Sequence, residues 1–144
     1  MFPRGQTGGW IALTTNPVGH MQEFYDMLAE TMLQLNLGHL MDGLESQQQH
    51  RISSEKICHH LETVGFVISA VEHDSFSMRF ANGSAFLNHY LIKYAFMDGW
   101  KGIFPPELVK DVFIRLEANL NALAEGENEL KVTIPIAYIE GEKK

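Results

Sequence analysis

The stretch "TGGWIALTTNPVGHM" (residues 7–21) decides the fold class, because it joins a glycine pair, an apolar segment and a helix start. We expect Trp10 to Thr15 to form a short buried strand, since aromatic and β-branched residues favour strands. Asn16 is the expected N-cap of the next helix, and Pro17 follows at a position that needs no N–H donor. Only six residues precede Thr7. The sequence therefore poses the question of which sheet this strand joins.

Two helices are expected after this strand. The first has an apolar stripe with spacings of three and four and ends at Gly38; the stripe consists of Met21, Phe24, Tyr25, Leu28, Met32 and Leu35. Residues 39–52 hold a polar run and are expected to be a loop. Ser53 or Ser54 caps the second helix, Gly65 closes it, and its stripe consists of Ile57, Leu61 and Val64.

Strands and helices continue to alternate along the rest of the chain. Residues 66–71 are rich in β-branched residues and predict a strand, and residues 74–80 alternate as a further strand or as its continuation past a bend. Asn82-Gly83-Ser84 predicts a turn with Ser84 as cap. The helix expected over residues 85–97 is apolar nearly all round, so we expect it to be covered on several sides.

The C-terminal part predicts one more helix and one more strand. The helix begins at Pro105-Pro106-Glu107, carries a stripe from Val109 to Leu123 and ends at Gly126. The strand covers residues 130–139, where Pro135 predicts a bulge or a partly unpaired edge. The predicted fold class is α/β (α+β-like): a single domain, 1–144, with an irregular segment 1–9. Three to four strands form a small mixed sheet covered by about four helices. A sheet this small leaves one edge or face in need of a partner.

Composition narrows the class of protein. The 144 residues carry a formal charge of −7, which disfavours nucleic-acid binding through phosphates. The single cysteine, Cys58, rules out an internal disulfide and fits a reducing compartment. The N-terminus lacks a signal-peptide pattern and no apolar run spans a membrane, so we expect a cytoplasmic protein without membrane contact.

Four segments in order resemble the C-terminal half of a class I S-adenosylmethionine-dependent methyltransferase of the type 11 kind. Thr7-Gly8-Gly9 with "WIALTTN" resembles the turn into the fifth strand, with Thr7 in place of the usual proline, and "NPVGHMQEFY" resembles the next helix. "HRISSEKICHHLETVGFVI" resembles the helix, Gly-Phe turn and sixth strand. "FSMRFANGSAFLNHYLIKYAF" and "LKVTIPIAYIEGEK" resemble the insertion and the last antiparallel strand. The resemblance implies a Rossmann-like fold in which the strand at residues 10–15 is a middle strand.

The cofactor determinants of that family lie in its first half, which this sequence does not contain. A glycine-rich turn there meets the cofactor's amino-acid part, and an acidic residue holds the ribose. None of the twelve glycines forms a GxGxG pattern. We therefore expect no cofactor in this chain alone, and S-adenosylmethionine only where the missing half is supplied.

The resemblance also implies where a surviving pocket would lie, at the carboxyl ends of the parallel strands. The candidate substrate-binding residues there are Asn16, His20, Tyr25, Arg79, Asn82 and His89. Of these, His20 is a candidate general base and Arg79 a candidate anchor for an acidic acceptor.

Structural roles compete with each of these assignments. Asn16 fits a helix cap, His20 a surface histidine, Arg79 a solvated or salt-bridged guanidinium, and His89 a hydrogen-bonded core group. Asn82 stands where the family more often has aspartate. His59 and His60 are adjacent on a helix and point in different directions, so no metal site is expected.

Three hypotheses follow. The chain is an inactive half of a methyltransferase, with a complementary half as its partner. Alternatively, it is a binding or oligomerising module that forms a homodimer through the exposed sheet edge, with or without a small-molecule pocket. The third is an active methyltransferase acting on a small molecule, with its site completed by a second chain.

Overall fold

The computed structural model describes residues 8–144, which form a three-stranded sheet and seven α-helices. The strands are β1 (Trp10–Thr15), β2 (Phe66–Phe80) and β3 (Leu130–Lys143), in the order β1-β3-β2. The longer helices are α1 (Gln22–Gln34), α2 (Met41–Gln48), α3 (Ser54–Thr63) and α7 (Pro106–Glu127), and the short ones are α4 (Gly83–Asn88), α5 (Tyr90–Ala95), α6 (Met97–Lys101) and a 3-10 turn, Gly38–Leu40. The expected α/β class is confirmed.

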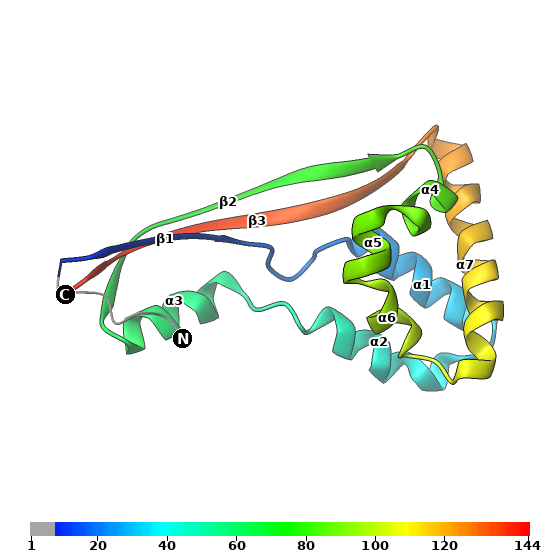
Figure 1. The fold of residues 1–144 in the computed structure, drawn as a ribbon, viewed down its shortest axis with the longest axis horizontal. Helices are drawn as coiled ribbons and strands as arrows, with labels where there is room; N and C mark the ends of the chain where they lie inside the picture. The colour runs from blue at the N-terminus through cyan, green and yellow to red at the C-terminus, as the bar shows by residue number, and fades with distance from the viewer. Residues whose placement is uncertain (1–7) are drawn as a thin grey trace. The chain divides into compact units, whose positions relative to one another are not determined.

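The chain divides into two compact units. The sheet unit contains residues 8–20, 51–76 and 134–144, and the helical unit contains residues 21–50 and 77–133. The sheet unit thus holds β1, α3 and most of β2 and β3, whereas the helical unit holds the remaining helices (Figure 1). The single domain expected from the length stays a prediction.

In the sheet unit, β3 is the central strand and both neighbours run against it. β1 pairs antiparallel with β3, with Trp10 opposite Glu142 and Thr15 opposite Ala137. The end of β3 lies beside the start of β2, since the Lys144 N–H donates to the Gly65 carbonyl. β1 and β2 therefore run in the same direction, each antiparallel to β3.

Pro135 fits this central strand because of where the ladder with β1 ends. The last β1 pair is Thr15 with Ala137, so Pro135 lies beyond it. The side-chain amide of Asn16 donates to the Pro135 carbonyl at 3.0 Å. In an antiparallel strand the N–H and C=O of one residue face the same neighbour, so the missing N–H of Pro135 faces the side where β1 has already ended.

The helical unit closes around aromatic side chains. Trp100 stacks on Phe24 with ring centroids 4.0 Å apart, and its indole N–H donates to the Tyr25 hydroxyl at 3.2 Å. α7 packs against α1 and α4. Gly83 permits the close approach of α4 to α7, because a Cβ there would lie 2.3 Å from the Leu120 Cβ. These contacts exclude water from a continuous core.

Several predicted boundaries are confirmed. Ser53 caps α3 by accepting the Lys56 N–H, and Gly65 follows the helix with φ 92°. α7 begins at Pro106 as predicted, although it runs past Gly126 and ends before Asn128, which adopts φ 65°. The two strand segments of residues 66–80 form one continuous strand.

Other predictions are wrong. Asn16 is not a helix cap: α1 begins only at Gln22, because the Met21 N–H is bonded to the Thr133 carbonyl and Met21 adopts a left-handed backbone. Ser84 does not cap α4; the Asn82 side chain does, by accepting the Ala85 N–H at 2.8 Å.

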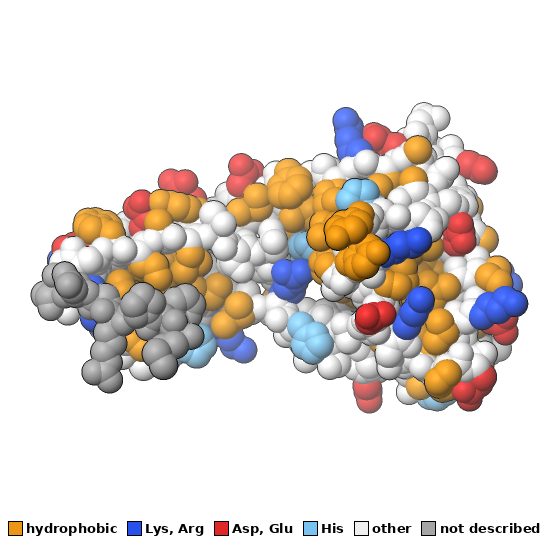
Figure 2. Space-filling model, in the orientation of Figure 1, with side chains coloured by type: hydrophobic (Ala, Val, Ile, Leu, Met, Phe, Trp, Pro, Cys, Tyr) orange, Lys and Arg blue, Asp and Glu red, His pale blue; other side chains and the backbone are white. Residues whose placement is uncertain are grey.

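The predicted loop at 39–52 and the predicted helix at 85–97 are also wrong. Most of residues 39–52 forms α2. This helix buries one side chain, Leu44, and packs against α1 and α6. The latter breaks at His89 and Phe96 into three short helices. Tyr90 and Tyr94 are consequently exposed rather than covered, at 74% and 76%. Figure 2 shows hydrophobic side chains gathered over α5.

Candidate functional site

The first strand has the composition of a buried strand but little cover. Residues 10–15 read WIALTT and contain no charge, yet Trp10 is 65% exposed and none of the six is fully buried. The prediction of a buried strand is therefore wrong for the described chain. The reason is topological: β1 lies at the end of the sheet order and has only β3 as a neighbour among residues 8–144. Its outer row of backbone groups is unpaired there.

The other edge of the sheet differs chemically. β2 carries Glu72, His73, Asp74 and Arg79 along its length. Arg79 pairs with Glu129 at 3.2 Å. Natural proteins use charged side chains on edge strands to discourage pairing with another chain. By this criterion the β2 edge is protected and the β1 edge is not.

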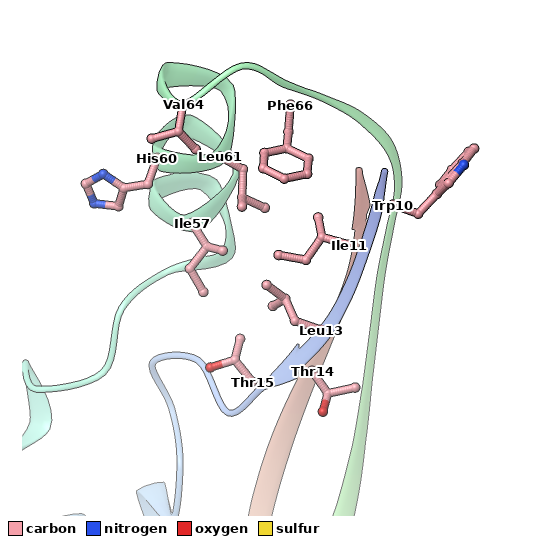
Figure 3. A pocket seen from close by; sticks show the side chains of 10 residues that line it. All are labelled: Trp10, Ile11, Leu13, Thr14, Thr15, Ile57, His60, Leu61, Val64 and Phe66. Carbon is pink, nitrogen blue, oxygen red and sulfur yellow. The ribbon is translucent and has the colours of Figure 1, made fainter. Parts of the chain in front are cut away.

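A groove lies beside the unprotected edge, between β1 and α3. Its volume is about 710 Å³, within the range of ligand sites, and we call it the β1 groove. Half of its lining comes from β1 and the rest from α3 and the start of β2: Trp10, Ile11, Leu13, Thr14, Thr15, Ile57, His60, Leu61, Val64 and Phe66. The groove therefore lies between α3 and the face of the sheet toward which Ile11 and Leu13 point, next to the β1 edge (Figure 3).

The side chains in the β1 groove follow from the periods of its two elements. Ile57 and Leu61 lie on one stripe of α3 and face the groove, and Val64 lines it from the turn that follows the helix (Figure 3). Ile11 and Leu13 alternate along β1 and point toward α3, whereas Trp10 points away from it (Figure 3). The groove can therefore bind an apolar surface, and its polar groups are limited to threonine hydroxyls and the His60 imidazole.

The six residues predicted to line a pocket are divided between the two units. Asn16 and His20 belong to the sheet unit, and Tyr25, Arg79, Asn82 and His89 belong to the helical unit. Their role in substrate binding stays a prediction, because no contact observed here tests it.

The contacts of five of these residues indicate structural roles. Asn16 bonds to Pro135, Tyr25 is buried against Trp100, and Asn82 caps α4. Arg79 forms the predicted salt bridge with Glu129. His89 is not the expected core group: it is exposed at the break between α4 and α5, with its ring edge against Phe80.

His20 is the one candidate with a strongly perturbed pKa. Burial lowers the pKa of its imidazole to about 4, and the nearby positive charge of Arg51 acts in the same direction. The ring is therefore neutral at pH 7. A neutral imidazole can accept a proton, but a pKa this low makes it a weak general base at that pH.

The described residues do not fit the cofactor turn that the resemblance implies. The Gly8 N–H donates to the Lys143 carbonyl at 2.8 Å and the Lys143 N–H to the Gly9 carbonyl at 2.7 Å, so the glycine pair belongs to the sheet ladder. At the N-terminus of α1 the Glu23 carboxylate accepts the backbone N–H and the hydroxyl of Thr133. The glycine pair is thus engaged in the sheet, and the carboxylate disfavours an anionic ligand at the start of α1.

No model of a known protein family matches this chain, and a search of curated proteins finds no match either. The methyltransferase resemblance accordingly stays a prediction.

One further arrangement was missed by sequence reasoning. Ser54 Oγ and His73 Nε2 share a hydrogen bond of 2.8 Å between α3 and β2. Ser54 is buried at the first residue of α3, so this pair ties the helix to the strand. Burial, with the charges of Glu62 and Glu55, raises the pKa of the Cys58 thiol, which stays protonated.

The described residues contain neither a metal-binding cluster nor a membrane-spanning helix. Across residues 8–144, no three histidine, cysteine or acidic side chains gather closely enough to hold a metal ion. None of the helices in that range combines the length and the apolar character needed to cross a bilayer.

Proposed function

We propose that this chain is a methyltransferase-like half-domain that binds a complementary α/β chain through β1 and does not bind S-adenosylmethionine alone. One observation carries the proposal: the outer edge of β1 is uncharged and unpaired among the described residues, with an apolar groove beside it. Uncovered edges of this kind can template pairing with another strand, so the β1 edge is suited to binding a second chain.

The strand directions support the resemblance behind this proposal. The segment that resembles the family's last antiparallel strand is β3, and it is antiparallel to β1, the segment that resembles the fifth strand. β2, which resembles the sixth strand, runs in the same direction as β1. Likeness of fold alone does not assign an activity, so the activity is argued from the site.

In this proposal the partner chain supplies the binding site for the methyl donor. Methyl transfer needs donor and acceptor held in line, which supplies as much as roughly 7–11 kcal/mol of the barrier. The glycine pair of this chain is already committed to internal hydrogen bonds, and the Glu23 carboxylate lies at the start of α1. A complementary chain would have to contribute the donor site.

A calorimetric titration of the purified monomer with S-adenosylmethionine tests the proposal. We expect no heat of binding and no increase in melting temperature, because a ligand that binds the native state must stabilise it. Micromolar binding to a lone monomer, with the mass measured by light scattering, would refute it.

A second measurement uses a fragment with the first four strands of a complete class I methyltransferase. Ala12→Lys adds a charge to β1, and Ser69→Lys adds the same charge to an exposed position of β2. We expect Ala12→Lys to weaken the complex at least about tenfold and Ser69→Lys to leave it unchanged. Equal effects of the two variants would place the interface elsewhere.

A further inference from the structure

We propose that the β1 groove binds a long-chain carboxylic acid, with the alkyl chain between β1 and α3 and the carboxylate at Lys143. This ligand site goes beyond the proposed function and does not depend on it, because the partner pairs with the edge of β1 whereas the acid lies against the side that faces α3.

The size of the β1 groove favours a small molecule over a protein. Its volume of about 710 Å³ is within the range of small-molecule sites. β1 has six residues and is roughly 20 Å long, and packed layers lie roughly 10 Å apart, so the groove offers on the order of 400 Å² of buried area in total. Specific protein interfaces bury roughly 1,200–2,000 Å², which is more than the groove alone supplies.

α3 is held to the sheet at both ends, which keeps the groove open. At the first residue of the helix, Ser54 Oγ shares a hydrogen bond of 2.8 Å with His73 Nε2 of β2. Just after its last turn, the Val64 carbonyl accepts a hydrogen bond from Lys143 Nζ of β3. Because both ends are fixed to strands, the groove is formed before a ligand arrives, and binding does not have to order it.

The walls of the groove suit an alkyl chain. Ile57 and Leu61 face it from α3. Ile11 and Leu13 face it from β1 (Figure 3), and none of its ten lining residues is aspartate, glutamate, lysine or arginine.

The length of the groove limits the length of the chain. β1 lines it over roughly 20 Å, and the α3 side, from Ile57 to Val64, lines roughly 10 Å. An extended chain of single bonds advances about 1.2 Å per bond, so about 8 to 16 carbons fit.

Lys143 places a positive charge at one end of the groove. Its Nζ lies 5.2 Å from the ring centroid of Phe66 and donates to the Val64 carbonyl, and both of these residues line the groove. An ammonium group has three N–H donors, so this contact leaves donors for a ligand. None of the salt bridges within residues 8–144 involves Lys143. A carboxylate is therefore the head group that this end favours.

The two ends of the groove differ, which gives the ligand a direction. Thr14 and Thr15, at the end of β1 far from Phe66, contribute neutral hydroxyl side chains. The carboxylate therefore lies at the Phe66 end, and the methyl end of the chain points toward Thr15.

Calorimetric titration of the full chain with sodium decanoate, kept below its micelle concentration, tests the proposal. We expect saturable binding of one decanoate per chain. Decyltrimethylammonium has the same alkyl chain with a positive head group and should bind at least about tenfold more weakly. Octanoate, shorter by two methylenes, should bind about fourfold more weakly, because a fully buried methylene contributes about fourfold and the groove is open on one side.

Two valines provide a matched pair of variants. Val64 is 58% exposed and lines the groove, whereas Val67 is 52% exposed and points to the opposite face of the sheet, since it follows Phe66 in β2. Val64→Asp places a carboxylate beside the head group and should weaken decanoate binding at least about tenfold. Val67→Asp should leave the affinity unchanged. Equal losses for the two variants would overturn the proposal.

Lys143→Gln tests the head-group contact, because glutamine keeps an N–H donor and removes the charge. It should weaken decanoate binding at least about tenfold and leave the binding of neutral 1-decanol unchanged, which would show that the groove stays intact. Equal losses for decanoate and decanol, or equal affinity of the wild type for decanoate and the trimethylammonium probe, would overturn the proposed site.

Light scattering on the same samples tests the other occupant. A wild-type dimer that Val64→Asp converts to a monomer would mean that a second copy of the chain fills the groove, and this would overturn the proposal. Absence of decanoate binding would overturn it as well, while the use of the β1 edge is tested separately by Ala12→Lys in the complex.

Discussion

The helical unit encloses its hydrophobic side chains, whereas the sheet unit leaves most of its own half-covered. In the helical unit Trp100, Phe24 and Phe86 are at most 1% exposed. In the described part of the sheet unit the fully buried hydrophobic side chains are Ile134, Ala137 and Ile139, all on the central strand. Both units contain similar apolar residue types, so the difference lies in the cover that each receives. The helical unit covers its own core, and the exposed apolar surface of the sheet unit is what the proposed partner would cover.

The two tryptophans give the largest test of this comparison. Trp100→Ala removes the centre of the aromatic core and should cost about 3–5 kcal/mol of unfolding free energy, measured by urea denaturation. Trp10→Ala, at an exposed position of β1, should cost under about 1 kcal/mol in the lone chain.

The fluorescence of these single-tryptophan variants provides a control. The variant that keeps Trp100 should emit at a shorter wavelength than the variant that keeps Trp10, since only Trp100 is shielded from water. Similar costs for both substitutions would mean that the β1 face is covered in the lone chain, which contradicts the comparison.

Two glycine substitutions test how tightly the helical unit is packed. Gly83→Ala places a Cβ 2.3 Å from the Leu120 Cβ and 3.0 Å from its carbonyl carbon, so α4 and α7 must separate. We expect a loss of about 2–3 kcal/mol, measured by denaturant unfolding. Gly126→Ala is the matched control on α7, where a Cβ meets nothing within 4 Å. It should be neutral or stabilise by up to about 1 kcal/mol. A neutral Gly83→Ala would contradict the close packing of α4 on α7.

The loss of stability on acidification tests whether His20 is buried as a neutral ring in the sheet unit. Its pKa is about 4 in the folded chain, below the ordinary value of 6.5, so the unfolded chain binds more protons between these two values. Stability should therefore fall as the pH decreases from 6.5 toward 4. The part due to His20 is about 2 kcal/mol, after allowance for partial exposure.

The measurement compares the wild type with His20→Gln by thermal or urea unfolding across this range. Other groups titrate in both proteins, so the difference isolates the imidazole. We expect the variant to lose less stability on acidification. Parallel curves would show that His20 is not buried as a neutral ring.

Sequence patterns correctly predicted the features that depend only on a few neighbouring residues. The Ser53 cap and the Pro106 start each depend on a few neighbouring residues, and both are confirmed. α2 and the breaks at His89 and Phe96 were missed, because packing between helices decides them. Tertiary contacts override propensity in such short segments.

The candidate site was predictable only in part. The small number of strands predicted an edge in need of a partner; β1 is an uncharged edge strand, and its use in binding stays a prediction. The β1 groove was not predicted, because it joins β1 to α3, more than forty positions later in the chain. The available signal was that WIALTT lacks any charge, whereas the strand at 66–80 holds four charged or titratable residues. The mistaken cap at Asn16 has the same origin, since Pro135 lies far away in sequence.

The smallest expected effect concerns this Asn16 contact at the end of β1. Asn16→Ala removes the hydrogen bond to the Pro135 carbonyl and should cost about 1 kcal/mol in urea unfolding. Asn16→Asp is the matched control: it keeps the size of the side chain but places a carboxylate against the carbonyl oxygen, so it should cost at least as much. If Asn16 served mainly as a helix cap, aspartate would replace it without loss, because aspartate caps helices as well as asparagine does. A stable Asn16→Asp variant would therefore restore the capping role and weaken the account of how β3 tolerates a proline.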